Sequence, residues 1–341
     1  MHVGILTGGG DCPGLNAVIR ALTLALTEAG DVRVSGIRQG FLGLLEDRVQ
    51  PLDAVRLRGL INEGGTLLGS HNRADPFAYF GAGGADCSAR ALDCLQRHGI
   101  DVLVAVGGDG TMTIAERFAR LGVPVVGVPK TIDNDLMHNE RSFGFDSAVA
   151  VVADALERLT TTARSHGRVM VLETMGRHAG WIALEGGLAG GADAIVLPEL
   201  AYDGQALAAL CERRCREQGY ALVCVAEGVK LAAASAGETV GQRLMQDLAP
   251  RLGPEAELRY TLLGHLQRGG APTAFDRVLS TRFGVQAAQL VLQRRHGHMV
   301  ALQGDRCVSV SLTDVAGASR LVPLDHELMQ AARCLGVLAN P

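Results

Sequence analysis

The stretch with the clearest potential for chemistry is a charged cluster that directly follows an apolar run. Its members are a cation, a hydroxyl and two carboxylates, namely Lys130, Thr131, Asp133 and Asp135. In an extended backbone Asp133 and Asp135 would point to the same side, so their charges would repel and one acid would hold its proton more tightly. Such a pair suits a site in which one acid accepts a proton and the other orients a substrate. An Asx-rich turn after a strand is the alternative interpretation.

A glycine-rich loop near the start of the chain is a candidate phosphate site. The segment Thr7–Gly14 follows a short apolar run and precedes a helical pattern, so free N–H groups at a helix N-terminus could bind an anion. It is not the dinucleotide fingerprint, because a third glycine after Gly8 and Gly10 would fall on Pro13. It is not a Walker A loop either, because the chain has no Gly-Lys pair. A plain turn is the alternative.

A second loop, Gly107–Thr111, has the sequence G-G-D-G-T after a buried apolar run. This pattern is typical of nucleotide phosphotransferases. Its glycines would let a phosphate approach the backbone, and Asp109 could hold Mg²⁺ through water. Thr111 is expected to begin the following helix and to supply its hydroxyl and N–H.

Further basic side chains could bind phosphate. Arg259 and the segment Gly264–Gly270 combine arginine, histidine and glycine, which suits a dianionic phosphate, although a solvated loop would look similar. Arg73 lies in a polar stretch of residues 60–76 and could also reach a phosphate.

The elements that would position these residues alternate between strand and helix. Expected strands are residues 2–6, 32–37, 101–106, 123–128, 168–173, 194–197 and 221–226. Expected helices are residues 15–29, 88–98, 147–163, 181–188, 207–218 and 280–293, with others ending near 120 and starting near 325. The alternation restarts after about residue 165. The predicted fold class is therefore α/β, with two Rossmann-like domains whose mainly parallel sheets are covered by helices.

Composition narrows the function. The chain has 341 residues and a net charge of −4, which argues against general nucleic-acid or membrane binding. Its eight cysteines are scattered, with no C-x-x-C and no Cys/His cluster of zinc spacing, so we expect reduced thiols and a cytoplasmic location. The start goes straight into a strand, so no signal sequence is expected. No apolar run is long enough to predict a membrane-spanning helix.

Taken together, the motifs resemble those of 6-phosphofructokinases along nearly the whole chain. The matching stretches, in the family's order, are Gly4–Arg20, Gly107–Thr111, Pro129–Asp135, Met175–Arg177, Glu227 and His265–Gly270. NAD kinases and lipid kinases also carry G-G-D-G-T but lack T-I-D-N-D and G-H-L-Q-R-G-G. The resemblance implies the phosphofructokinase fold. Its phosphoryl-donor domain would be residues 1–137 plus about 267–315, and its sugar-phosphate domain residues 138–266 plus the C-terminal tail.

The resemblance also implies roles for individual residues. Asp133 would accept the proton of the sugar 1-hydroxyl, and the catalytic group would be Lys130, Thr131, Asp133 and Arg177. Donor binding would use Gly9, Arg73, Gly108, Asp109, Gly110 and Thr111, with Asp109 holding Mg²⁺. Sugar-phosphate binding would use Thr131, Asp133, Asp135, Arg168, Met175, Gly176, Arg177, Glu227, Arg259, His265 and Arg268. Arg168 and Arg259 match arginines that the family lends across a subunit interface, which implies a homodimer or homotetramer.

Two positions bear on the phosphoryl donor. Pyrophosphate users of the family typically have aspartate where this chain has Gly110, and that carboxylate repels the α-phosphate of a nucleotide. Pyrophosphate users also have lysine where this chain has Lys130, while many ATP enzymes have glycine. Repulsion usually discriminates more sharply than attraction by one flexible cation. The expected reaction is therefore transfer from ATP to fructose 6-phosphate, with a reversible pyrophosphate-dependent enzyme as the alternative.

The family's effector site is expected to be absent. Allosteric bacterial members have a second arginine four residues after the one matching Arg20, and this chain has Leu24 there. Residues 217–220 replace an expected basic cluster. We expect no control by ADP or phosphoenolpyruvate through that site.

Overall fold

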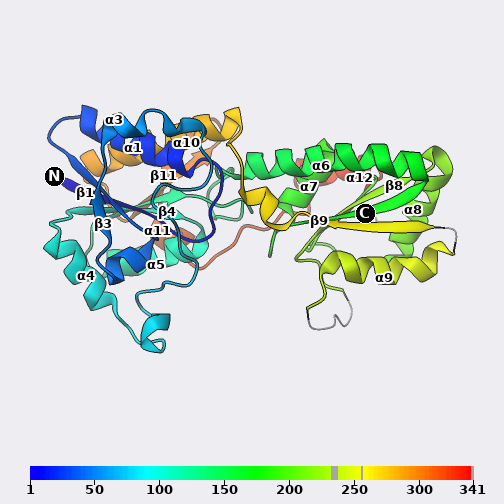
Figure 1. Ribbon diagram of the computed structural model, residues 1–341, viewed down its shortest axis with the longest axis horizontal. Helices are drawn as coiled ribbons and strands as arrows, with labels where there is room; N and C mark the ends of the chain where they lie inside the picture. Colours follow the sequence, from blue (N-terminus) through cyan, green and yellow to red (C-terminus); the bar gives the residue numbers. More distant parts are fainter. Residues whose placement is uncertain (232–236, 255, 339–341) are drawn as a thin grey trace. The chain divides into compact units, whose positions relative to one another are not determined.

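The chain folds into two compact units, seen in the computed structural model (Figure 1), which describes residues 1–231, 237–254 and 256–338. The first unit comprises residues 1–131, 136–147 and 268–319. The second comprises residues 132–135, 148–267 and 320–341, of which the last three lie outside the described residues. The domain limits expected from the sequence stay a prediction; in the structure, residues 136–147 group with the first unit.

The first unit is built on a seven-stranded sheet in the order β11-β10-β5-β4-β1-β2-β3. Five strands run parallel: β1 (His2–Thr7), β2 (Arg33–Ile37), β4 (Val102–Gly107), β5 (Val125–Pro129) and β10 (His298–Gln303). The two edge strands, β3 (Val49–Pro51) and β11 (Arg306–Ser311), are antiparallel to their neighbours. β1 and β4 are buried along their whole length, as expected for parallel strands covered on both faces.

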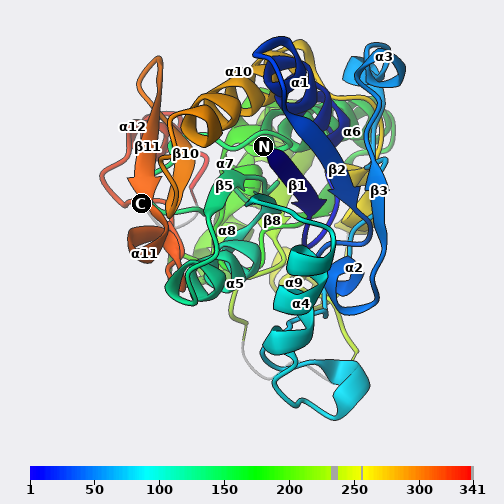
Figure 2. The same ribbon diagram turned by 90° about the vertical axis from the view of Figure 1, so that its left-hand side faces the viewer.

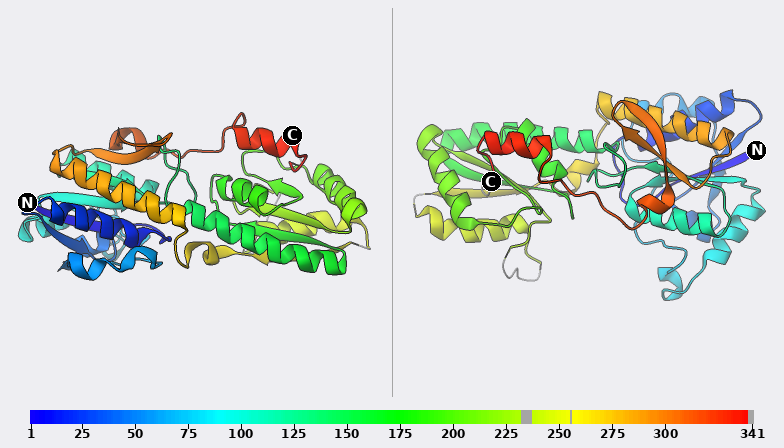
Figure 3. Two further views of the ribbon diagram at one scale, coloured as in Figure 1. Left: turned by 90° about the horizontal axis from the view of Figure 1, so that it is seen from above. Right: turned by 180° about the vertical axis from the view of Figure 1, so that it is seen from behind.

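Helices cover both faces of this sheet (Figure 2). On one face α1 (Leu15–Glu28) packs along α10 (Ala274–Leu292), and Figure 3 shows the two side by side. The other face carries α2 (Phe41–Leu45), α4 (Ser88–Arg97), α5 (Asp109–Arg120) and α11 (Leu312–Val315). Shorter elements are α3 (Ala54–Leu57), η1 (Leu60–Asn62) and η2 (Phe80–Ala82). Phe118 of α5 stacks on Phe41 of α2 with ring centroids 5.9 Å apart, within an apolar cluster on this face.

The second unit is built on a four-stranded parallel sheet in the order β7-β8-β6-β9. Its strands are β6 (Arg168–Thr174), β7 (Ala194–Val196), β8 (Ala221–Ala226) and β9 (Glu257–Leu262). One face carries α6 (Phe145–His166), α7 (Trp181–Ala189) and α12 (Glu327–Cys334), and the other carries α8 (Gly204–Gln218) and α9 (Val240–Leu252) (Figure 1). The 3-10 turn η3 (Gly264–Arg268) follows β9.

The predicted α/β class with mainly parallel sheets is confirmed, and every expected strand is present with ends shifted by at most two residues. The sequence analysis did not predict β9 or α9. β9 has no buried run, because all its side chains are partly or fully exposed, and α9 contains Pro250, which breaks a helical pattern. α10 begins at Ala274 rather than near residue 280, because Thr273 caps it.

No helix among the described residues is long and apolar enough to cross a membrane.

Candidate active site

A pocket of about 580 Å³ lies in the first unit where two predicted loops meet. Its lining comes from the glycine loop after β1 and from the polar stretch that contains Arg73, namely Gly9, Gly10, Asp11, Thr66, Gly69, Ser70, His71, Asn72 and Arg73. Gly9 and Arg73, both predicted for donor binding, therefore line one cavity. The Arg73 guanidinium lies 5.6 Å from the centroid of the Phe80 ring, which supports its exposed side chain.

Hydrogen bonds hold the two loops together. Thr7 Oγ1 donates to the carbonyl of Gly69 at 2.8 Å and lies 3.0 Å from Thr66 Oγ1. Ser70 Oγ donates to the carbonyl of Thr7 at 3.1 Å, and the Gly9 N–H donates to the carbonyl of His71 at 3.4 Å. The shape of the pocket is thus fixed by backbone groups as well as by side chains.

Lys130 joins the glycine loop to the G-G-D-G-T loop. Its side chain is buried, and its Nζ donates to the carbonyl of Gly10, while its own N–H donates to the carbonyl of Gly107 at 2.9 Å. A Cβ at Gly9 would lie 3.5 Å from Lys130 Nζ. The ammonium therefore lies directly beside the loop predicted to bind the donor phosphates.

Thr111 is a buried residue inside α5, so the expectation that it begins this helix is wrong. The helix begins at Asp109 with Gly108 at its N-cap. Thr111 packs so closely under the strand end that a Cβ at Gly107 would lie 2.2 Å from Thr111 Oγ1. The glycine at 107 is therefore required by this close approach.

Asp109 lies at the N-terminus of α5, where its carboxylate is partly exposed. Its Oδ1 accepts from the N–H of Gly317 at 3.0 Å and from Thr113 Oγ1 at 3.4 Å. Gly317, which fixes the carboxylate from far along the chain, was not predicted. No local pattern in the sequence signals a backbone contact of this kind.

Gly110 follows Asp109 and is exposed. A Cβ built at this position would meet no heavy atom within 4 Å. The position that would carry a carboxylate in pyrophosphate users thus opens onto free space.

The segment with the two acids is not extended. Asn134, which separates Asp133 from Asp135, adopts a left-handed conformation with φ of 52°. The argument that an extended backbone points both carboxylates to one side is therefore wrong, because the backbone turns between them. Both acids are partly buried, and Asn134 itself is buried.

Arg320 orders this turn within the second unit. Its Nη2 donates to the carbonyl of Asn134 at 3.0 Å, and its N–H donates to the carbonyl of Asp135 at 2.7 Å. The guanidinium lies 4.2 Å from the Trp181 ring centroid, and Trp181 Nε1 donates back to the Arg320 carbonyl at 3.0 Å. The sequence analysis missed Arg320, whose neighbours carry no motif.

The predicted sugar-contacting residues meet at the carboxyl ends of β6 and β8, which are neighbouring strands. The N–H of Glu227 donates to the carbonyl of Thr174 at 2.9 Å, which places Glu227 beside the start of the Met175–Arg177 loop. A Cβ at Gly228 would lie 2.5 Å from the carbonyl oxygen of Arg177, so this loop packs tightly against it. Met175 is fixed further by its N–H, which donates to the buried Gln267 Oε1 at 3.3 Å.

Arg168 and Arg259 converge on one carboxylate that the sequence analysis did not single out. Arg168 and Glu257 are paired on the neighbouring strands β6 and β9, and their side chains form a 3.0 Å ion pair. Arg259 Nη2 contacts the same Glu257 oxygen. The Arg168 guanidinium lowers the pKa of Glu257 below its usual value.

His265 and Arg268 share the turn η3, but their surroundings differ. His265 is exposed, while Arg268 belongs to the first unit and its Nη1 donates to the carbonyl of Asp11 at 3.2 Å. A Cβ at Gly10 would lie 2.6 Å from the Arg268 guanidinium. The structure thus places Arg268 beside the glycine loop.

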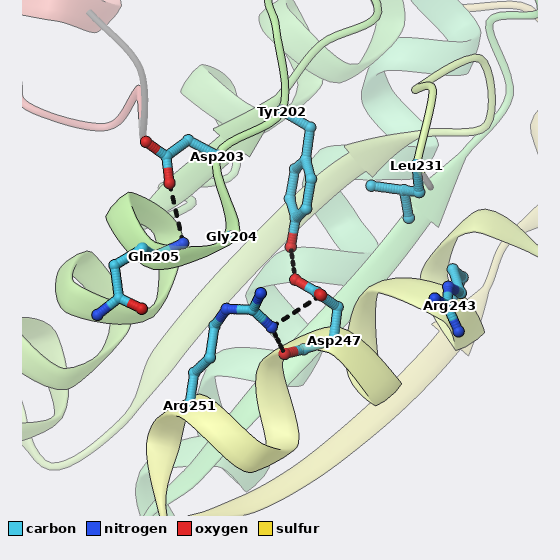
Figure 4. A pocket seen from close by; sticks show the side chains of 8 residues that line it. All are labelled: Tyr202, Asp203, Gly204, Gln205, Leu231, Arg243, Asp247 and Arg251. Atoms are coloured by element: carbon cyan, nitrogen blue, oxygen red, sulfur yellow. Dashed lines mark hydrogen bonds and ion pairs between the residues drawn. The ribbon is translucent and has the colours of Figure 1, made fainter. Parts of the chain in front are cut away.

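A second pocket, of about 480 Å³, lies in the second unit (Figure 4). Tyr202 Oη donates to Asp247 Oδ2 at 2.6 Å, and Arg251 forms a 2.7 Å ion pair with Asp247 Oδ1. None of the residues predicted from the sequence lines this pocket.

Comparison with known proteins agrees with the motifs. The family described as "Phosphofructokinase" matches residues 2–291. The chain is 44% identical over 339 residues to "ATP-dependent 6-phosphofructokinase 3" of Bacteroides thetaiotaomicron, covering 99% of both chains. It is also 44% identical to "Pyrophosphate--fructose 6-phosphate 1-phosphotransferase" of Streptomyces coelicolor, covering 97% of this chain and 98% of the other.

Solved phosphofructokinase structures resemble this chain as well. "Structure of phosphofructokinase from Saccharomyces cerevisiae" superposes with a TM-score of 0.81 at 30% identity, over 92% of this chain and 45% of the yeast chain. A matching family over most of the chain and full-length relatives above 40% identity agree with the sequence motifs. The chain therefore belongs to the phosphofructokinase family.

Proposed function

We propose that the protein transfers the terminal phosphoryl group of ATP to the 1-hydroxyl of fructose 6-phosphate, giving fructose 1,6-bisphosphate and ADP. The open space at Gly110 is the observation that carries the choice of donor, because a Cβ there would meet no heavy atom within 4 Å and glycine adds no carboxylate to repel an α-phosphate. The relative from Bacteroides thetaiotaomicron, named as ATP-dependent, supports the same choice.

The reaction is an in-line displacement, in which positioning and charge neutralisation supply most of the catalysis. Asp133 accepts the proton of the 1-hydroxyl as the oxygen attacks the terminal phosphorus. The bond from that phosphorus to ADP breaks, and ADP leaves. Arg177 stabilises the charge that develops on the transferred group. Thr131 and Asp135 position the reacting centre, and Arg320 holds the backbone that carries Asp135.

A divalent cation fits the donor side. Among the described residues Asp109 accepts its hydrogen bonds at Oδ1, and its side chain is partly exposed, so Oδ2 can face a hydrated ion. One carboxylate together with substrate phosphates is the ligand set that Mg²⁺ commonly uses. Mg²⁺ held there would neutralise charge on the donor phosphates. The other donor contacts in this proposal are Gly9, Arg73, Gly108, Gly110 and Thr111.

The sugar phosphate would be bound by the residues that the family resemblance assigns to it, together with arginines shared between subunits. Met175, Gly176 and Glu227 come from adjacent strand ends and would contact the sugar. His265 and Arg268 would bind its 6-phosphate. Arg168 lies on β6 and Arg259 on the neighbouring edge strand β9, and we propose that they reach the phosphate of a neighbouring subunit in a homodimer or homotetramer.

Pyrophosphate is the second candidate donor, favoured by Lys130. Its ammonium is buried beside the glycine loop, where a compact point charge could stabilise a phosphate leaving group. The Streptomyces coelicolor relative named for pyrophosphate shows that such an enzyme can be equally similar to this chain.

Replacement of Asp133 tests whether the protein is a kinase with this base or only a binder of sugar phosphate. We expect Asp133→Ala to lower kcat by about 10²–10⁴-fold, because a positioned general base contributes about that much, while sugar affinity changes little. The measurement is steady-state kinetics with fructose 6-phosphate, ATP and Mg²⁺, paired with equilibrium binding of fructose 6-phosphate.

Two outcomes would contradict this proposal. Turnover by the variant within a few-fold of the original chain would show that Asp133 is not the base. Tight sugar-phosphate binding without any turnover by the original chain would indicate a sensor on this fold.

A further inference from the structure

A cluster of three possible metal ligands lies in the first unit, outside the residues proposed for catalysis. Among the described residues, Asp47, Cys94 and His98 form the one group of at least three such side chains whose ligand atoms all lie within 4.8 Å of one another. Asp47 Oδ1 is 2.6 Å from His98 Nε2 and 3.5 Å from Cys94 Sγ.

The fold brings these residues together from two places. Cys94 lies on α4 and His98 is its C-cap, so the spacing of four residues puts both on one helix face. Asp47 comes from the turn between α2 and β3, where it adopts a left-handed conformation with φ of 58°. The sequence analysis found no Cys/His cluster of zinc spacing, because the third ligand is distant in the chain and the other two follow helical spacing.

One carboxylate oxygen lies at the centre of the cluster. Asp47 Oδ1 accepts from the Cys94 thiol, and the His98 Nε2 contact points at the same oxygen. The other oxygen, Oδ2, accepts from Arg97 Nη1 at 2.6 Å, and Arg97 also pairs with Asp93. Arg97 therefore orients the carboxylate through Oδ2, as residues next to metal ligands commonly do, and Oδ1 faces the sulfur and the imidazole.

We propose that Asp47, Cys94 and His98 bind a borderline divalent cation of the Zn²⁺ type, with the fourth position open to water. One oxygen, one nitrogen and one sulfur ligand suit Zn²⁺ better than the hard cations Mg²⁺ and Ca²⁺. Binding breaks the S–H bond of Cys94 and forms a sulfur–metal bond, and the displaced proton leaves to solvent.

The distances fit with a small adjustment. At tetrahedral angles, ligand atoms bound at about 2.1–2.3 Å from a metal lie roughly 3.4–3.6 Å apart. The sulfur–oxygen distance of 3.5 Å already matches this range, and the 2.6 Å contact between Asp47 and His98 must open. The side chains of Asp47 and His98 are 43% and 34% exposed, respectively. This exposure allows them to rotate apart and gives the ion access from solvent.

Charge is balanced around the bound ion. The Asp47 carboxylate and the Cys94 thiolate together neutralise a divalent cation, and Arg97 is compensated by Asp93, with which it forms a 2.8 Å ion pair. Cys94 is fully buried, so the soft ligand is shielded from solvent while the other two face it. This asymmetry favours retention of a metal that prefers sulfur.

Cobalt titration tests the site directly in the full-length protein. Co²⁺ is added to metal-free protein, and we expect a thiolate-to-cobalt charge-transfer band that saturates at one ion per chain and disappears when Zn²⁺ is added. Cys94→Ser should abolish the band, and His98→Gln should weaken Co²⁺ binding by at least about tenfold because it removes one ligand. Cys215→Ser, which removes a half-buried helical cysteine elsewhere, should leave the titration unchanged.

Three outcomes would overturn the proposal: no charge-transfer band in the original chain, a band that persists in Cys94→Ser, or a band lost only in Cys215→Ser. Phosphofructokinase turnover of each variant reports whether it folds, because none of these residues belongs to the proposed catalytic group. If Cys94→Ser does not fold, the more exposed His98→Gln variant decides, since unchanged Co²⁺ affinity there would also refute the site.

Discussion

At the scale of single residues, the choice of phosphoryl donor depends on Gly110, where a Cβ would meet no heavy atom within 4 Å, and on Lys130, whose Nζ donates to the carbonyl of Gly10. The motifs G-G-D-G-T and T-I-D-N-D indicated a phosphotransferase. The first combines glycines that let a phosphate approach with a carboxylate for Mg²⁺, and the second contains an acid that could accept a proton. The turn at Asn134 and the contact of Arg320 with the Asp135 backbone could not be predicted, because both depend on residues almost two hundred positions apart. Glu257, the shared partner of Arg168 and Arg259, was not singled out because its pairing with Arg168 depends on β9, a strand that the sequence did not predict.

Substitution of Gly110 tests the argument about the phosphoryl donor. We expect Gly110→Asp to raise the KM for ATP by roughly 10- to 100-fold, because two like charges a few ångströms apart near a surface repel by about 1–3 kcal/mol. The space around this position and its place at a helix N-terminus should let the variant fold. Steady-state kinetics over a range of ATP concentrations measures the effect.

The matched control is Gly110→Asn, which adds nearly the same volume without charge. An unchanged KM in the aspartate variant, or an equal rise in the asparagine variant, would show that charge at this position does not select the donor.

At the scale of elements, one buried amide fixes the loop that leads to the candidate donor pocket. Asn16 of α1 donates to the carbonyls of Glu63 and Gly64 at 3.2 and 3.1 Å, and its Oδ1 accepts from the N–H of Leu67 at 2.7 Å. This loop continues into Thr66–Arg73, which lines the candidate donor pocket. The helix was predicted from its apolar period, but an inward-facing asparagine gives no such signal.

Removal of this amide should loosen the donor pocket. Asn16→Ala leaves three backbone groups without their side-chain partner, and we expect a loss of about 2–4 kcal/mol in the free energy of unfolding together with a higher KM for ATP. Denaturant unfolding and steady-state kinetics measure both effects.

Thr23→Val, a buried change on the same helix, is the control, because Thr23 Oγ1 has no hydrogen-bond partner among the described residues. Equal behaviour of the two variants would mean that Asn16 does not hold the loop.

At the scale of the whole molecule, the alternation of strands and helices predicted two α/β domains with mainly parallel sheets, because buried runs of β-branched residues are a clear signal of such strands. Only the family resemblance, and not this alternation, implied that the chain crosses back between the units; in the structure residues 268–319 belong to the first unit and residues 320–338 to the second. Edge elements such as β9 were missed because half-exposed strands lack an apolar run.

A buried acid in the first unit should make stability depend on pH. Burial raises the pKa of Asp276 to about 6, even though its carboxylate accepts hydrogen bonds from Ser147. The folded state therefore keeps this proton while the unfolded state loses it, so the contribution is greatest below about pH 4 and is lost as pH rises to about 6. Asp276→Asn should remove this loss, which is on the order of 3 kcal/mol.

Urea unfolding of both proteins between pH 4 and 7 measures the difference. Asp154→Asn is the control, because the pKa of this exposed acid is lowered by Arg158 and its effect should have the opposite sign and be small. If the original chain and Asp276→Asn show parallel pH profiles, Asp276 is not the group responsible.

Initial rates with fructose 6-phosphate and Mg²⁺ decide whether this chain uses ATP. ATP and pyrophosphate are compared at equal concentrations, with formation of fructose 1,6-bisphosphate as the readout. We expect turnover with ATP and none with pyrophosphate, which would mean that the open position at Gly110 decides the donor and that Lys130 is compatible with it. Turnover with pyrophosphate but not with ATP would show that ATP is not the donor and would assign the choice of donor to Lys130.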